Sequence, residues 1–199
     1  MNKFQVIINN PLVIFRYFNA KYRNFIFPNY RFIKSGRLKY LKKPWCNQIT
    51  LLTGEGTIKI GSNCSFGNKL GGFYRCGSIE FQARYKYSTI IIGNSVSTNN
   101  NIFLCAANFI QIGSNTLIGQ NVTIMDHEAH EIDPEKRRQI GRIGQIIIGE
   151  NTWLGNNVTI LKNTEIGDNS IVAAGAVVSG KFPENVIIGG IPAKIIRTL

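Results

Sequence analysis

The sequence predicts an all-β fold, a solenoid prism built from short strands, and three observations support this prediction. The first is a repeat of six residues that runs in register from Ile148 to Val177. Each unit opens with an aliphatic residue and carries a small or β-branched residue four places later. A fixed short period is typical of solenoids, and six residues is neither a helix period nor plain strand alternation.

The second observation is the fourth place of each unit, which Asn or Gly occupies. These residues adopt positive φ most readily, so we expect the chain to turn a corner there. They are Asn63, Asn115, Asn121, Asn151, Asn157, Asn163, Asn169 and Gly175. The third observation is composition, because Val, Ile, Thr, Asn and Gly are weak helix formers. A β-sandwich is the alternative, but it predicts irregular strand spacing of roughly 8–12 residues.

The first 50 residues lack the repeat and form a basic, aromatic appendage. Residues 1–45 hold ten Lys or Arg and no Asp or Glu, within a chain of 199 residues and net charge +12. We expect a partly helical cap over the open end of the solenoid. Contact with an anionic membrane surface or another polyanion is a compatible alternative. Nucleic acid is disfavoured because no recognised binding motif accompanies the charge. The aromatic residues are Phe4, Phe15, Tyr17, Phe18, Tyr22, Phe25, Phe27, Tyr30, Phe32, Tyr40 and Trp45.

The location of the protein is predicted from its apolar segments and its cysteines. The run from Leu12 to Tyr17 is too short for a membrane span, which needs about 20 apolar residues. It also lacks a signal-peptide core and cleavage site. Four cysteines without Cys-x-x-Cys pairing favour a reduced, cytoplasmic protein, peripheral at the inner face of the membrane if the appendage binds there. Cys64 occupies an inward place of the repeat, which predicts burial.

After the appendage, the repeat divides the chain into a prism and a tail. We expect the prism over 51–183, with degenerate units at 70–88 and an insert near 105–109. The repeat breaks at 126–147, which we expect to protrude as a loop, and 184–199 forms the tail. Loops that project from a rigid repeat scaffold are where binding and catalysis concentrate. Both histidines of the chain, His127 and His130, lie in this break.

The hexads resemble the hexapeptide-repeat family, whose fold is a left-handed parallel β-helix. The resemblance covers 56–199 and implies coils of 18 residues; the left hand is a property of the family and opposes the general crossover rule. Many members are acetyltransferases that use acetyl-CoA, with one histidine as general base. Imidazole suits the task because a sugar hydroxyl is a poor nucleophile at neutral pH.

The run from Ile124 to Pro134 resembles the sugar O-acetyltransferase pattern hydrophobic-x-Asp-x-Asp-x-His, followed by x-hydrophobic-Asp-Pro. That resemblance, and a gapless one to streptogramin acetyltransferases, favours His130 as the base, with His127 as the alternative. Two solvated loop histidines without a catalytic role remain a further alternative. Asp126 and Glu128 are the candidate carboxylates that orient the base. Glu128 departs from the usual Asp of the pattern, which leaves the acceptor open.

The resemblance also implies sites for acetyl-CoA between adjacent prisms, and therefore a homotrimer. Trp153 begins a Trp-Leu-Gly similar to the family's Trp-Ile-Gly, and an aromatic shield on the prism wall is the alternative reading. The tail from Gly189 to Arg197 resembles the family's Gly-x-Pro-Ala-Lys-x-x-Arg ending. The implied contacts of the coenzyme are Trp153, Asn156, Ala174, Ser179, Lys194 and Arg197.

The favoured function is O-acetylation of a sugar in a surface polysaccharide or related glycan, with no metal required. N-acetylation of an amino sugar and O-acetylation of a small antibiotic are the enzymatic alternatives. Carbonic anhydrases share the prism, but a zinc site of that kind needs three histidines. A non-catalytic β-helix, such as an ice-binding or scaffold protein, needs neither a histidine loop nor this tail.

Overall fold

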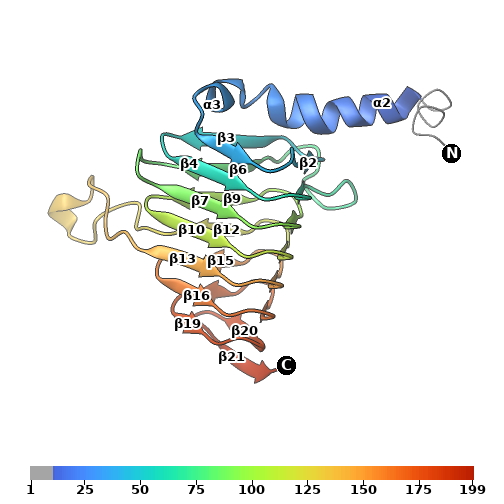
Figure 1. The fold of residues 1–199 in the computed structure, drawn as a ribbon. Coiled ribbons are helices and arrows are strands. Elements are labelled where there is room, and N and C mark those ends of the chain that lie inside the picture. The colour runs from blue at the N-terminus through green and yellow to red at the C-terminus, as the bar shows by residue number, and fades with distance from the viewer. Residues whose placement is uncertain (1–10) are drawn as a thin grey trace.

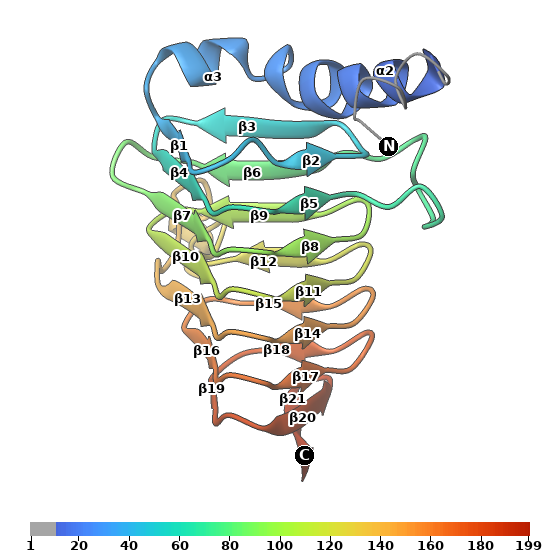
Figure 2. The same ribbon diagram turned by 45° about the vertical axis from the view of Figure 1, so that its right-hand side comes forward.

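The computed structural model describes residues 11–199, so Phe4 of the aromatic stretch lies outside the described residues. The body is a left-handed parallel β-helix of triangular section, as the sequence predicts (Figure 1, Figure 2). Each coil passes through three sheets in turn, which we name A, B and C. Successive coils stack along the prism axis at strand spacing, about 4.8 Å.

The three sheets form the three faces of the prism. Sheet A contains β1 (Leu38–Tyr40), β4 (Thr57–Ile60), β7 (Thr89–Ile92), β10 (Phe109–Ile112), β13 (Gln145–Ile148), β16 (Thr164–Ile166) and β19 (Lys181–Phe182). Sheet B contains β2 (Trp45–Cys46), β5 (Ser65–Phe66), β8 (Ser97–Thr98), β11 (Leu117–Ile118), β14 (Trp153–Leu154), β17 (Ile171–Val172), β20 (Val186–Gly190) and β21 (Ala193–Thr198). Sheet C contains β3 (Thr50–Gly54), β6 (Ile79–Ala83), β9 (Phe103–Ala106), β12 (Thr123–Met125), β15 (Thr159–Ile160) and β18 (Val177–Val178).

The corners follow the Asn and Gly places of the repeat. All seven predicted Asn residues have φ between 52° and 61°, and Gly175 has φ 75°. Their side chains also join neighbouring coils: Asn151 Nδ2 donates to Asn169 Oδ1 at 2.9 Å, and Asn121 Nδ2 donates to Asn157 Oδ1 at 3.0 Å. Asn therefore supplies both the left-handed backbone of the corner and a hydrogen bond between coils.

The narrow core is filled by the two inward places of each unit. Ile148, Leu154 and Ile160 open their units and are fully buried. Where the second inward residue is polar, it bonds within the corner, as Thr164 Oγ1 does to the Leu161 carbonyl at 2.6 Å. Cys64 is buried, as predicted. Cys105 is buried as well, and this burial raises the pKa of its thiol to about 11.

Helices lie across the N-terminal end of the prism (Figure 1, Figure 2). They are α2 (Pro11–Phe18), the π-helix η1 (Asn19–Ile26) and α3 (Tyr30–Lys34). Phe25 and Phe32 pack into the prism core, and Asn29 Nδ2 donates to the Thr50 carbonyl at 2.7 Å. Within residues 11–199, no helix has the length and apolar character needed to cross a bilayer.

The ends of the prism differ from the expected segment limits. β1 and β2 fall inside the stretch expected as an appendage, yet they pair in parallel with β4 and β5. At the other end, β20 continues sheet B beside β17, and β21 folds back antiparallel on β20. Part of the expected tail therefore extends a face of the prism.

Candidate active site

The break in the repeat forms a protruding loop, which Figure 1 shows leaving the side of the prism. It leaves sheet C after β12 and returns into β13, so it spans 126–144. The two limbs bond to each other: Gly144 N donates to the Asp126 carbonyl at 2.7 Å, and Glu131 N donates to the Gln139 carbonyl at 2.8 Å. A short 3₁₀ helix, η2 (Pro134–Lys136), lies between the limbs. We call Asp126, His127 and Gly144 the base of the loop and 128–143 its arm.

His127 lies in the base, with its side chain fully buried. Its Nε2 is 2.9 Å from Arg84 Nη1, and its Nδ1 is 3.0 Å from Asp126 Oδ1. A guanidinium is a donor only, so Nε2 must accept from Arg84 and Nδ1–H must donate to the carboxylate. Both ring nitrogens are thus occupied, and neither is available to a substrate.

Asp126 is fully buried and organises the corner that precedes β10. Its carboxylate accepts hydrogen bonds from the amides of Ala107, Asn108 and Phe109 at 2.7–2.8 Å. A buried carboxylate is stable when several donors and a cation network surround it. Asp126 also accepts the hydrogen bond from Nδ1–H of His127, the histidine that the sequence gives as the alternative base.

His130 lies in the arm and is exposed. Its Nδ1 is 2.8 Å from the carbonyl oxygen of Arg137. A carbonyl only accepts, so Nδ1 carries the proton and, in the neutral ring, Nε2 carries the lone pair. A backbone carbonyl thus takes the orienting place that the sequence assigned to a carboxylate.

Glu128 bonds to the prism and not to either histidine ring. Its Oε1 is 2.8 Å from Lys162 Nζ, and its Oε2 accepts from Arg142 N at 3.2 Å. The hydrogen bond from Lys162 is the main cause of the lowered pKa of Glu128. Lys162 lies between β15 and β16, so this pair ties the arm to a lower coil.

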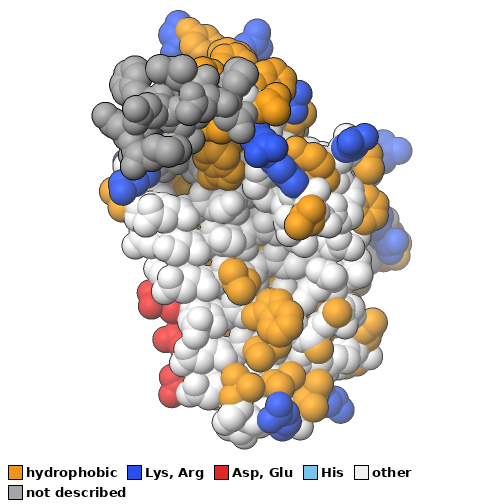
Figure 3. Space-filling view, turned by 90° about the vertical axis from the view of Figure 1, so that its right-hand side faces the viewer, with side chains coloured by type: hydrophobic (Ala, Val, Ile, Leu, Met, Phe, Trp, Pro, Cys, Tyr) orange, Lys and Arg blue, Asp and Glu red, His pale blue; other side chains and the backbone are white. Residues whose placement is uncertain are grey.

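Sheet B carries an outward row of apolar side chains. In register, Leu117 lies opposite Trp153, Trp153 opposite Ile171, and Ile171 opposite Ile187. Trp153 is 53 % exposed. Figure 3 views this side of the prism and shows hydrophobic side chains gathered over its middle and lower coils. Exposed contiguous apolar surface of this kind marks a binding or assembly face.

Asn156 and Ala174 lie at the corner between sheets B and C, in successive coils. A Cβ on Gly155 would stand 2.6 Å from Ala174 N, so glycine is required for these coils to stack. Asn156 and Trp153 line one cavity of about 320 Å³. Ser179 follows β18 and lies at the next corner, between sheets C and A.

The two tail cations reach the face of sheet B through a β-bulge. Arg197 lies opposite Ile187 and Lys194 opposite Gly189, with the register shift between Ile187 and Ile188. Since residues 187 and 189 share one side of β20, the bulge brings Lys194 and Arg197 to that same side. It is the outward side, because Ile188 between them is fully buried. Figure 3 shows Lys and Arg side chains at the foot of the apolar face.

The structure separates the predicted residues into two groups. Trp153 and the tail cations share sheet B, with Asn156 and Ala174 along its edge. The loop that holds His130 leaves the prism at the corner between sheets C and A, on the side away from sheet B (Figure 1). In the part of the chain that the structure describes, no three His, Cys, Asp or Glu side chains gather to hold a metal ion.

Residues that the sequence did not single out complete the loop. Arg84, Lys162 and the carbonyl of Arg137 each bond to one of the predicted residues. Arg84 and His127 are 43 residues apart, and no local pattern marks such a pair.

Comparisons with known proteins agree with the fold. The family described as bacterial transferase hexapeptide (six repeats) matches residues 145–180. An Escherichia coli K12 protein with the provisional name lipopolysaccharide biosynthesis O-acetyl transferase WbbJ is 31% identical over 73% of this chain and 74% of its own. The galactoside O-acetyltransferase of the same organism is 36% identical over 56% of this chain and 55% of its own length. The chain also matches the solved structure of a galactoside acetyltransferase in complex with coenzyme A, with TM-score 0.55 and 25% identity. This match covers 91% of this chain and 74% of the galactoside acetyltransferase chain.

Proposed function

The chain belongs to the hexapeptide-repeat acetyltransferase family and is an acetyl-CoA-dependent acyltransferase, and from this premise we propose that it acetylates a sugar hydroxyl of a surface polysaccharide or related glycan. The relatives named as O-acetyltransferases of lipopolysaccharide biosynthesis and of galactosides support a sugar acceptor. In this proposal His130 is the general base.

The contrast between the two histidines carries this assignment. Nδ1 of His130 is held by a carbonyl, and its Nε2 has no hydrogen-bond partner among residues 11–199. Both ring nitrogens of His127 are engaged, by Arg84 and Asp126, in the buried base of the loop. Nε2 of His130 accepts the hydroxyl proton while the sugar oxygen bonds to the acetyl carbon. The carbon–sulfur bond then breaks, and the departing thiolate takes the proton from the imidazolium.

The residues of sheet B fit the donor. The cavity beside Trp153 and Asn156 suits the pantetheine arm, and Lys194 and Arg197 supply cations for the phosphates. Ala174 and Ser179 continue this contact along the corners of the lower coils. An extended ligand of this kind needs a groove, and a second prism against the apolar face would provide its other wall.

We infer that the site forms between chains of a homotrimer, because the loop that holds His130 leaves the corner between sheets C and A, whereas Trp153 lies on sheet B, the opposite face. In a ring of three, the loop of each chain reaches the sheet B face of its neighbour. The closed ring also covers the exposed apolar row on every chain.

An acceptor screen tests the function. The purified protein is incubated with acetyl-CoA and a panel of sugars, oligosaccharides, amino sugars and small antibiotics, and products are identified by mass spectrometry. We expect an added acetyl group on a glycan hydroxyl, located by fragmentation. Transfer to an amine alone, or to the antibiotics alone, would overturn the sugar O-acetyltransferase assignment.

Subunit mixing tests the shared site. His130→Ala is inactive through its loop, and the triple variant Trp153→Ala, Lys194→Gln, Arg197→Gln is impaired through its face. If sites form between chains, random mixed trimers recover about a quarter of wild-type sites, since each site needs one intact loop and one intact face. No recovery would show that loop and face of one chain act together.

A further inference from the structure

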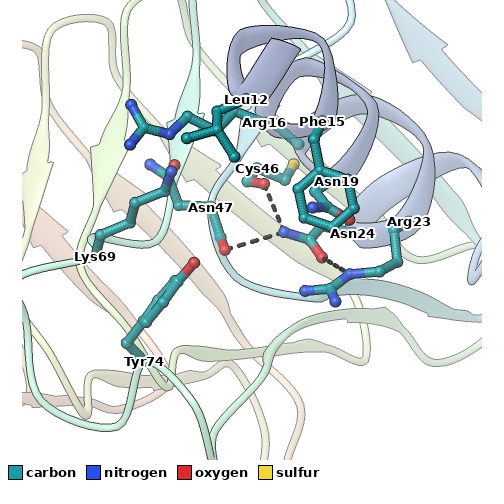
Figure 4. Close-up of a pocket in the computed structure, with 11 residues that line it drawn as sticks. Leu12, Phe15, Arg16, Asn19, Arg23, Asn24, Cys46, Asn47, Lys69 and Tyr74 are labelled. Carbon is teal, nitrogen blue, oxygen red and sulfur yellow. Dashed lines mark hydrogen bonds between the residues drawn. The ribbon is translucent and has the colours of Figure 1, made fainter. Parts of the chain in front are cut away.

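A second cavity lies between the N-terminal helices and the first coils of the prism, far along the fold from the loop (Figure 4). It measures about 240 Å³. Three cations line it, Arg16 from α2, Arg23 from η1 and Lys69 from the segment after β5. Figure 4 shows Arg16 and Lys69 extending along one side of the pocket and Arg23 across from them.

The three cations have no negative partner in residues 11–199. The Lys and Arg ion pairs found there involve Lys136, Lys162 and Lys181, and Arg23 Nε donates only to the amide oxygen of Asn24, at 3.2 Å. Residues 11–45 contribute no Asp or Glu at all. Three cations without an acidic neighbour around one hollow give it a positive potential, which attracts an anion. Phosphate suits the arrangement because guanidinium groups bind its oxygens in pairs.

The same helices expose large apolar side chains. Leu12 is 61 % exposed, Phe15 62 % and Phe18 44 %. Leu12 and Phe15 also line the cationic pocket, so the apolar surface and the charges are continuous. Apolar and aromatic residues interleaved with Lys and Arg on a short helix are typical of segments that lie in the interface of an anionic bilayer.

We propose that this pocket and the apolar face of α2 form a membrane-docking site for anionic phospholipid. The pocket binds the phosphate of a headgroup, and Leu12, Phe15 and Phe18 enter the interfacial region. A soluble phosphate would account for the cations but not for the apolar side chains, and a bilayer offers partners for both.

Vesicle sedimentation of the full chain tests this proposal. We expect binding to vesicles of phosphatidylcholine mixed with phosphatidylglycerol, little binding to phosphatidylcholine alone, and loss of binding at high salt. The variant Arg16→Gln, Arg23→Gln, Lys69→Gln loses about fivefold in partitioning per cation, on the order of 100-fold in all. The matched control Lys59→Gln, Lys86→Gln, Lys181→Gln removes the same charge from other parts of the prism and keeps most of the binding.

A second variant protects the test against misfolding. Leu12→Gln with Phe15→Gln changes exposed residues, keeps every charge, and also weakens vesicle binding. Thermal melts and acetyl transfer to a soluble acceptor report folding and the catalytic site separately, so failure here is distinguishable from failure of the proposed enzyme. Equal sedimentation of the pocket variant and its matched control overturns the proposal. Calorimetric binding of inorganic phosphate or pyrophosphate without vesicle binding overturns it in favour of a soluble anion.

Discussion

The base and the arm of the loop each hold a histidine, three residues apart, in opposite environments. In the base, His127 is buried between Arg84 and Asp126, and both ring nitrogens are used. In the arm, His130 is exposed, and within the described part of the chain only its Nδ1 has a partner. The base of the loop resembles the protein interior, where buried polar groups have hydrogen-bond partners. In the arm, Nε2 of His130 has no partner among residues 11–199. The difference indicates that a histidine can act as a general base only where one ring nitrogen has no partner in the protein and can accept a proton from the substrate.

Replacing each histidine separately tests this contrast with the largest expected effect. His130→Ala lowers the acetyl transfer rate by about 10³-fold, because general-base catalysis contributes typically 10²–10⁴-fold, and leaves the melting temperature unchanged. His127→Ala costs about 2 kcal/mol of unfolding free energy, because Arg84 and Asp126 lose a buried partner, and keeps turnover per folded molecule. Steady-state kinetics and urea unfolding of both variants measure these values. An inactive, stable His127→Ala beside an active His130→Ala would reverse the two roles.

Removing Asp126 gives the next largest effect, and we expect it to act only on the base of the loop. Asp126→Ala leaves three amides and the ring N–H of His127 without their acceptor, which we expect to cost about 3 kcal/mol. Glu135→Ala, an exposed acid of the same loop, should stay within about 0.5 kcal/mol of wild type. Urea unfolding compares the two. A loss of activity in Asp126→Ala with wild-type stability would instead place Asp126 in the chemistry.

The sequence predicted the prism well because its signals are local. Each corner is marked by one Asn or Gly with positive φ, and each inward place by an aliphatic or small residue. Both signals can therefore be read directly from the six-residue repeat. The start of the prism was placed too late, since β1 carries no hexad phrase and forms only by pairing with β4. The π-helical turn of η1 likewise has no signal in the sequence.

The loop was predicted only in outline because its bonds are long-range. The break in the repeat located both histidines, and the family pattern favoured His130. Arg84 directly follows β6, two coils away from β12. The partner of His130 is a backbone carbonyl, which any residue type would supply. Asp126 shows the same limit. Its position near both histidines suggested that it orients the general base, yet its carboxylate accepts most of its hydrogen bonds from the amides of 107–109.

The Glu128–Lys162 pair gives the smallest expected effect and tests how the arm is held. Because Lys162 lowers the pKa of Glu128 in the folded chain, the folded state binds fewer protons than the unfolded state. The pair therefore stabilises the protein above the ordinary carboxyl pKa, and this contribution disappears as pH falls through the lowered folded value. Glu128→Gln should melt below wild type at neutral pH, and the two should converge in acid.

A Lys162→Met variant provides the control for this pair, since it should show the same narrowing difference from wild type as pH falls. High salt should shrink the neutral-pH difference, because the pair is partly exposed. Acetyl transfer by both variants, measured at neutral pH, reports whether the tie positions His130. Lower turnover in both variants would mean that the arm depends on this ion pair for its position. Wild-type turnover in both variants would mean that the hydrogen bonds between the two limbs of the loop are sufficient to hold it.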